Sequence, residues 1–106
     1  IAAVILSQVM DKPTADTATL NLGHKRWAVD QGAIDTFSVP GMQATHWNEE
    51  HTVVRVPKDQ HVNIGDYVLL APRHVCSTVN LWEYFGIIDA YGTIVSTHTR
   101  VDARNL

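Results

Sequence analysis

The chain has 106 residues and 45% of them are hydrophobic, which is the size and composition of one globular domain. Eight Lys and Arg residues stand against eleven Asp and Glu residues and give a formal net charge of −3. The basic residues are not clustered as a phosphate-binding surface requires, and the longest apolar run near the start, residues 1–6, is far below the roughly 20 residues that span a bilayer. Neither a nucleic-acid partner nor a membrane role is expected.

A single cysteine, Cys76, cannot form a disulfide within the chain. Disulfides belong to oxidising compartments, so a cytoplasmic location is the expectation. The first residue is Ile, and it falls inside an apolar run that has the composition of a strand. We therefore expect the chain to be part of a longer protein.

The first half of the chain predicts strands at residues 2–9 and 17–22, separated by a break at residues 11–13 and closed by Gly23. Residues 24–30 fit either a short helix or an extended edge, with Trp27 and Val29 as their apolar members. Residues 38–42 contain a Pro-Gly pair, which predicts a tight turn with the Gly at positive φ.

The second half predicts strands at residues 52–56 and 67–71, both rich in β-branched or apolar side chains and both stopped by proline. Residues 84–89 and 93–99 flank Ala90-Tyr91-Gly92, which predicts a closing hairpin with a bulged turn.

These short strands, with no long segment of helical period, indicate a mainly β fold. We expect one domain over residues 1–106, closed as a small barrel or sandwich of about six or more strands with at most short helices. A helical bundle is excluded, because no apolar stripe of helical spacing can be drawn.

His74-Val75-Cys76 is the first candidate site. It follows the strand at residues 67–71, and in extended backbone two side chains at i and i+2 point to the same side. Imidazole and thiolate are both good zinc ligands, and two protein ligands leave positions open for substrate, as Lewis-acid catalysis requires. The alternative is a buried cysteine that acts as a small hydrophobic residue beside a surface histidine.

Glu49-Glu50-His51 is the second candidate, because a carboxylate beside an imidazole can orient a metal ligand or relay a proton. Its alternative is a solvated loop before a strand.

Several short elements together resemble the D-serine dehydratase-like family, and the likeness runs from about residue 4 to residue 104. It is a likeness to the C-terminal domain that this family of fold-type III pyridoxal-phosphate enzymes shares with D-threonine aldolases. In chain order the elements are Gly23-His24-Lys25, Val39-Pro40-Gly41, Glu49-Glu50-His51, Ile64-Gly65-Asp66, Pro72-Arg73-His74-Val75-Cys76-Ser77-Thr78-Val79-Asn80-Leu81 and Val101-Asp102-Ala103-Arg104.

The resemblance implies a β domain like the C-terminal domain of alanine racemase-type enzymes. It implies that His74 and Cys76 bind zinc, with Glu50 and His51 as candidates for the groups that orient these ligands. Pyridoxal phosphate would sit on a lysine of an N-terminal barrel domain that is not part of this chain, and Lys25 is not that lysine. The resemblance therefore assigns no catalytic and no cofactor-binding residue to this chain.

The implied function is that of a domain of a D-amino acid dehydratase, acting on D-serine or 3-hydroxyaspartate and inactive alone. Its partners would be the barrel domain and the D-amino acid, and the full-length enzyme would pair as a homodimer. D-threonine aldolases typically carry Asp where this chain has Cys76, so Cys76 favours the dehydratase. A D-threonine aldolase-type lyase domain and a free-standing binding or assembly domain are the alternatives.

Overall fold

The computed structural model of the chain describes residues 3–28 and 36–101. These residues form one sheet of six strands, one short helix and a separate two-stranded hairpin. The elements are β1 (Ile5–Asp11), β2 (Thr17–Leu20), β3 (Thr36–Phe37), β4 (Gln43–Trp47), β5 (Thr52–Arg55), β6 (Tyr67–Ala71), α1 (Val75–Val79), β7 (Tyr84–Ile88) and β8 (Ile94–Arg100).

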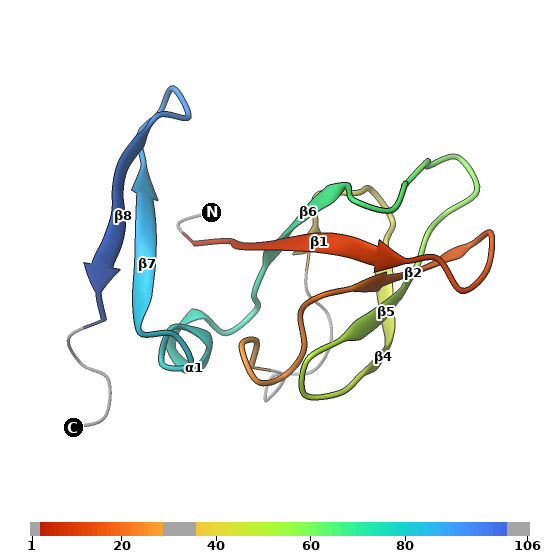
Figure 1. The fold of residues 1–106 in the computed structure, drawn as a ribbon, viewed down its shortest axis with the longest axis horizontal. Coiled ribbons are helices and arrows are strands. Elements are labelled where there is room, and N and C mark those ends of the chain that lie inside the picture. The colour runs from red at the N-terminus through yellow and green to blue at the C-terminus, as the bar shows by residue number, and fades with distance from the viewer. Residues whose placement is uncertain (1–2, 29–35, 102–106) are drawn as a thin grey trace.

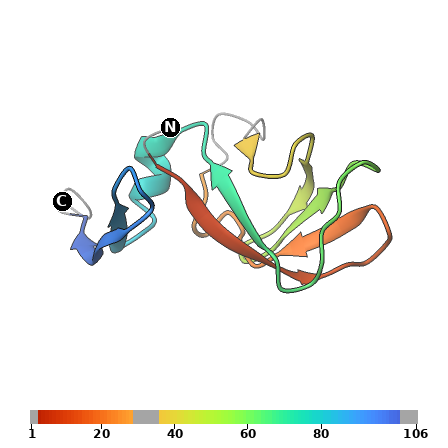
Figure 2. The same cartoon turned by 90° about the horizontal axis from the view of Figure 1, so that it is seen from above.

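The large sheet has the strand order β3-β6-β1-β2-β5-β4, and every neighbouring pair is antiparallel. Figure 1 and Figure 2 show that it curls around one face like half of a barrel. Within the described residues, the edge strands β3 and β4 do not pair with each other, so the barrel stays open on that side. The expected fold class, a mainly β domain of six or more short strands with at most a short helix, is confirmed. In place of the closed barrel or sandwich that was expected, the six-stranded sheet is a curled half-barrel.

The concave face of this sheet holds the hydrophobic core. Side chains of β1 and β2 alternate between buried and more exposed positions, which is the period-two pattern of a strand with one covered face. Trp27 is fully buried in the core, and its ring lies edge-on to Phe37 with the centroids 6.3 Å apart. The buried set is Ile5, Val9, Ala18, Leu20, Leu22, Trp27, Phe37, Met42, Val54, Val56, Val62, Val68 and Leu70.

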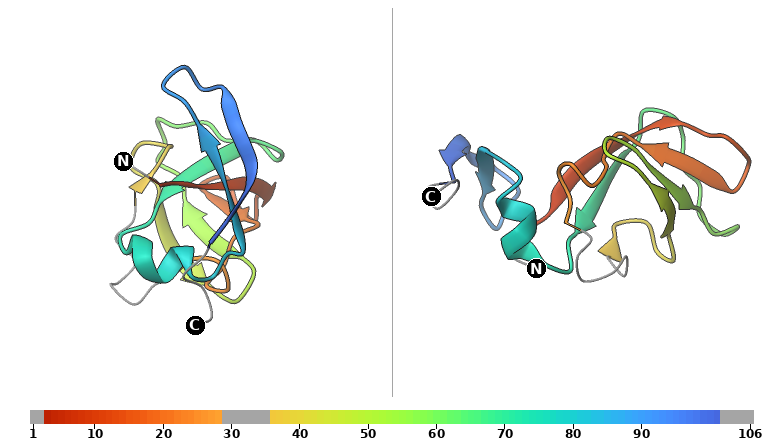
Figure 3. Two further views of the ribbon diagram at one scale, coloured as in Figure 1. Left: turned by 90° about the vertical axis from the view of Figure 1, so that its left-hand side faces the viewer. Right: turned by 90° about the horizontal axis from the view of Figure 1, so that it is seen from below.

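The β7–β8 hairpin stands beside the large sheet, with α1 at its base (Figure 1 and Figure 3). Every residue of β7 is exposed, although the strand is apolar in sequence. Large hydrophobic side chains exposed on the hairpin and its turn are Tyr84, Phe85, Ile87, Ile88, Tyr91, Ile94 and Val95. The hairpin thus presents an uncovered apolar surface.

The strand predicted at residues 67–71 is confirmed as β6, and the closing hairpin is confirmed as β7 and β8. The glycines of the two predicted turns have positive φ, 77° at Gly41 and 80° at Gly92. Of the undecided segment, residues 24–27 form turns, whereas Val29 and Asp30 lie outside the described residues, as do residues 102–104 of the resemblance. No helix in the described part of the chain is long and apolar enough to cross a membrane.

Three elements differ from the prediction. β3 was not predicted, because two residues are too few to show a strand pattern. β4 was not predicted, because it is an edge strand whose side chains are almost all exposed and so lack a burial period. The backbone after His74 was expected to be extended, but it turns into α1 at Val75. A helix of five residues is too short to show a helical period in the sequence.

Candidate metal centre

His74 and Cys76 lie where β6 gives way to α1. His74 is the N-cap residue of α1 and is still extended, with φ −117° and ψ 98°, whereas Cys76 is already in the first turn of the helix. The extended i and i+2 arrangement predicted for the pair is therefore wrong. The reason is local: the amide of Thr78 donates to the carbonyl of His74 at 3.3 Å and closes the first turn.

The exposure of these two side chains suits a ligand pair. Cys76 is exposed, so the alternative of a buried cysteine filling the core is wrong. His74 is half-buried, and its imidazole makes no capping hydrogen bond to α1. The imidazole and thiolate are thus held on one short stretch of chain, and together they form a donor set that zinc accepts.

No group of three or more His, Cys, Asp or Glu side chains that could hold a metal ion occurs among residues 3–28 and 36–101. A closed structural zinc site needs four protein donors. The described residues therefore contain no closed site of this kind.

A second segment, residues 26–28, is bonded directly to α1 and the turn after it. The amide of Ala28 donates to the buried hydroxyl of Thr78 at 3.2 Å. Arg26 Nη1 donates to the carbonyl of Leu81 at 2.9 Å, and Trp82 Nε1 donates to the carbonyl of Arg26 at 2.8 Å. The Arg26 guanidinium also lies over the Trp82 ring, 5.7 Å from its centroid. Arg26 and Trp82 were not predicted as part of the site, because they are distant in the chain and no spacing connects them.

The Gly23-His24-Lys25 element packs against the loop that carries Glu49-Glu50-His51. The amide of His24 donates to the carbonyl of Asn48 at 2.9 Å, and the amide of Lys25 donates to that of Glu49 at 3.0 Å. A Cβ on Gly23 would overlap the carbonyl oxygen of Asn48 and lie 2.5 Å from that of Glu49. Only glycine allows the two backbones to approach this closely.

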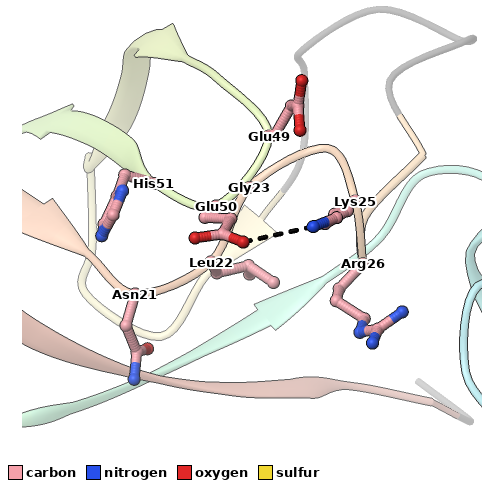
Figure 4. A pocket seen from close by; sticks show the side chains of 8 residues that line it. All are labelled: Asn21, Leu22, Gly23, Lys25, Arg26, Glu49, Glu50 and His51. Atoms are coloured by element: carbon pink, nitrogen blue, oxygen red, sulfur yellow. Dashed lines mark hydrogen bonds and ion pairs between the residues drawn. The ribbon is translucent and has the colours of Figure 1, made fainter.

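Lys25 and Glu50 form an ion pair of 3.2 Å between exposed side chains, drawn in Figure 4. The amides of Glu50 and His51 both donate to Asn48 Oδ1, so the loop is an ordered turn. The contacts described here join Glu50 to Lys25 and Asn48, and a role of Glu50 and His51 in orienting metal ligands stays a prediction. A shallow pocket is lined by Asn21, Leu22, Gly23, Lys25, Arg26, Glu49, Glu50 and His51.

The fold and the His-x-Cys element at the start of α1 define a class of protein domain: a curled β domain with a short helix and an appended hairpin. Residues 2–88 match the family model described as "Putative serine dehydratase domain", and the chain belongs to this family. The resemblance seen in the sequence is confirmed.

Similar proteins include both an aldolase and a dehydratase. The chain is 35% identical over 101 residues to a D-threonine aldolase of Arthrobacter sp., covering 94% of this chain and 26% of that protein. The crystal structure of D-threonine aldolase from Filomicrobium marinum matches 95% of this chain and 28% of its own, with a TM-score of 0.83 and 26% identity. The D-threo-3-hydroxyaspartate dehydratase of Delftia sp. HT23 has a TM-score of 0.70 at 17% identity, over 90% and 31% of the two chains, and this likeness shows the fold.

Further structures of D-threo-3-hydroxyaspartate dehydratase carry a single substitution. One has a histidine replaced by alanine, and another has a cysteine replaced by alanine and is in the metal-free form. The chain spans about a quarter to a third of the length of the proteins it matches.

Gly23→Ala should disrupt the contact between residues 23–25 and the loop at residues 48–50. The added methyl group has no space against two backbone carbonyls, so we expect the free energy of unfolding to fall by about 2 kcal/mol. Urea denaturation followed by tryptophan fluorescence measures this change.

Gly86→Ala is the matched control, because its Cβ would lie 3.3 Å from the carbonyl oxygen of Ser96, a contact that a small shift relieves. Equal effects of the two substitutions would contradict the close approach at Gly23.

Proposed function

We propose that the chain is the metal-ligand-bearing domain of a pyridoxal-phosphate-dependent D-amino acid dehydratase of the D-serine or 3-hydroxyaspartate type. His74 and Cys76 are the proposed zinc ligands. The observation that carries the proposal is the fixed His-x-Cys element at the junction of β6 and α1, with an exposed thiol, in a chain of the serine dehydratase domain family.

The donor set fits zinc. A neutral imidazole and a thiolate are preferred zinc ligands, and two of them leave coordination positions for water and substrate oxygen. When bound, zinc supplies Lewis-acid assistance to the departure of a β-hydroxyl group. In the proposed enzyme His74 and Cys76 hold the ion, and the rest of the domain fixes their position.

The solved dehydratase structures support the choice of ligands. One variant lacks a histidine, the other lacks a cysteine and is metal-free, and the two substituted positions are two residues apart. His74 and Cys76 have the same spacing. The comparison supports a histidine and a cysteine as the two residues of the metal site.

We further propose that the chain acts as one domain, residues 1–106, beside a barrel domain that provides the lysine for pyridoxal phosphate. The full-length enzyme would be a cytoplasmic homodimer. Support comes from the matched proteins, of which the chain spans only 26–31%, and from the apolar surface of the β7–β8 hairpin. On that hairpin Tyr91 is 93% exposed and Ile94 is 64% exposed, and an uncovered apolar surface of this kind marks an interface with other polypeptide.

A D-threonine aldolase-type lyase is the second candidate. The 35% identity to the Arthrobacter protein and the TM-score of 0.83 to the Filomicrobium structure favour it. Cys76 favours the dehydratase, because a thiolate selects zinc whereas a carboxylate at this position selects harder ions such as manganese. The metal preference of the chain distinguishes the two candidates.

His74→Ala and Cys76→Ala should each abolish zinc binding by the chain. Removing one of only two protein ligands leaves a single donor, which cannot retain the ion. Equilibrium dialysis against zinc and against manganese measures the effect, and we expect the wild-type chain to bind zinc in preference to manganese.

His61→Ala is the matched control, since His61 is an exposed histidine outside the element and should leave zinc binding unchanged. Preference for manganese would favour the aldolase candidate. Zinc binding that survives both ligand substitutions would exclude His74 and Cys76 as the ligands, and a wild-type chain that binds no metal would favour a binding or assembly domain.

The chain alone should release no pyruvate from D-serine when pyridoxal phosphate and zinc are supplied. The cofactor has no lysine of a barrel domain to bind, so α-proton removal has no catalyst in this chain. A coupled lactate dehydrogenase assay measures pyruvate. Turnover by the isolated chain that disappears in the Cys76→Ala variant would refute the proposal that this domain is inactive without the barrel domain.

A further inference from the structure

The helix that carries Cys76 is too short to hold its own shape. α1 has five residues, and isolated helices need about 12–15 residues before they are stable in water. Two of its closing hydrogen bonds are long, at 3.3 Å from the Thr78 amide to the His74 carbonyl and from the Asn80 amide to the Cys76 carbonyl. Two more at its end have ordinary lengths of 3.0 Å, from the Leu81 amide to the Thr78 carbonyl and from the Trp82 amide to the Val79 carbonyl. Because so short a helix is not stable by itself, contacts from outside it contribute to the geometry of the His-x-Cys element.

Those contacts come from residues 26–28. Two hydrogen bonds connect this segment to the turn after α1: Arg26 donates from its side chain to the carbonyl of Leu81, and Trp82 donates from its side chain to the carbonyl of Arg26. The guanidinium also covers the indole ring. A planar cation over an aromatic face adds attraction to the two hydrogen bonds.

The segment that holds α1 is itself anchored at both ends. On one side the Lys25 and His24 amides bond the carbonyls of Glu49 and Asn48. On the other side Trp27 is fully buried in the core of the sheet. Arg26 lies between these two anchors, so its contacts to Leu81 and Trp82, directly after α1, connect the end of the short helix to the rigid part of the fold.

We propose that Arg26 and Trp82 are positioning residues that fix α1 so that His74 and Cys76 face one ion. We name this pair the Arg26–Trp82 clamp. The inference rests on the proposed metal site and extends it: the Gly-His-Lys and Glu-Glu-His elements serve the site through the clamp, by supporting Arg26.

The clamp is testable without metal, because Cys76 is the chain's single cysteine and accepts one nitroxide spin label. Arg26→Ala and Trp82→Phe each remove one hydrogen bond of the clamp, and Trp82→Phe keeps an apolar ring in place. We expect the electron paramagnetic resonance spectrum of the label to gain a mobile component in both variants. Arg55→Ala is the matched control, since Arg55 is an exposed arginine on β5 that bonds Gln43, and its spectrum should equal that of the wild type.

The link to the metal is measured on unlabelled protein by titration with cobalt(II), whose bond to a thiolate gives a charge-transfer absorption. Loss of a group that orients a metal ligand typically costs at least about tenfold in affinity. We expect this loss in Arg26→Ala and Trp82→Phe and none in Arg55→Ala.

The positioning role would be overturned if the label spectra of both clamp variants matched that of the wild type. It would also be overturned if the cobalt affinity of Arg26→Ala and Trp82→Phe equalled that of the wild type. Retained cobalt affinity in Arg55→Ala with a tenfold loss in the clamp variants supports it. The proposed metal site would be overturned if the wild-type chain gave no cobalt band, or if its band persisted in the His74→Ala variant. The inference would then fall with the site, whatever the label shows.

Discussion

The backbone of Gly23 lies against the carbonyl groups of Asn48 and Glu49, with no space for a side chain between them. This contact brings residues 23–25 onto the turn between β4 and β5 and fixes the path of the chain toward Trp27, which is fully buried. This path leads to residues 26–28, which contact α1 and the turn after it. Arg26 donates to the carbonyl of Leu81, and its own carbonyl accepts from Trp82 Nε1.

The sequence predicted strands whose apolar or β-branched runs end at turn residues, whether one face is buried, as in β6, or the strand is exposed, as in β7. β6 and the β7–β8 hairpin were found because β-branched runs and turn residues mark their ends, and Gly41 and Gly92 adopt the positive φ that their turns require. β3 was missed because it has only two residues, and β4 was missed because an exposed edge strand has no burial period. The expectation of a mainly β domain does not depend on these two strands, which add to the predicted strands β6 and β5.

The residues of the candidate site could be predicted from its motif, but the backbone geometry of the site could not. The His-x-Cys spacing gave the two residues, but the change from extended backbone at His74 to helix at Val75 depends on the Thr78 and Asn80 hydrogen bonds and on contacts from residues 26–28. Such long-range contacts leave no local pattern. The Gly-His-Lys and Glu-Glu-His elements are far apart in the sequence, whereas the structure shows them bonded to each other.

The proposed zinc site consists of one imidazole and one thiolate and leaves coordination positions open. X-ray absorption spectroscopy of the zinc-loaded chain is the most direct test, because sulfur and nitrogen neighbours are distinguished by their distances. We expect one sulfur at about 2.3 Å and an imidazole nitrogen at about 2.0 Å, with the sulfur lost in the Cys76→Ala variant. A zinc spectrum with only oxygen and nitrogen neighbours in the wild-type chain would contradict it.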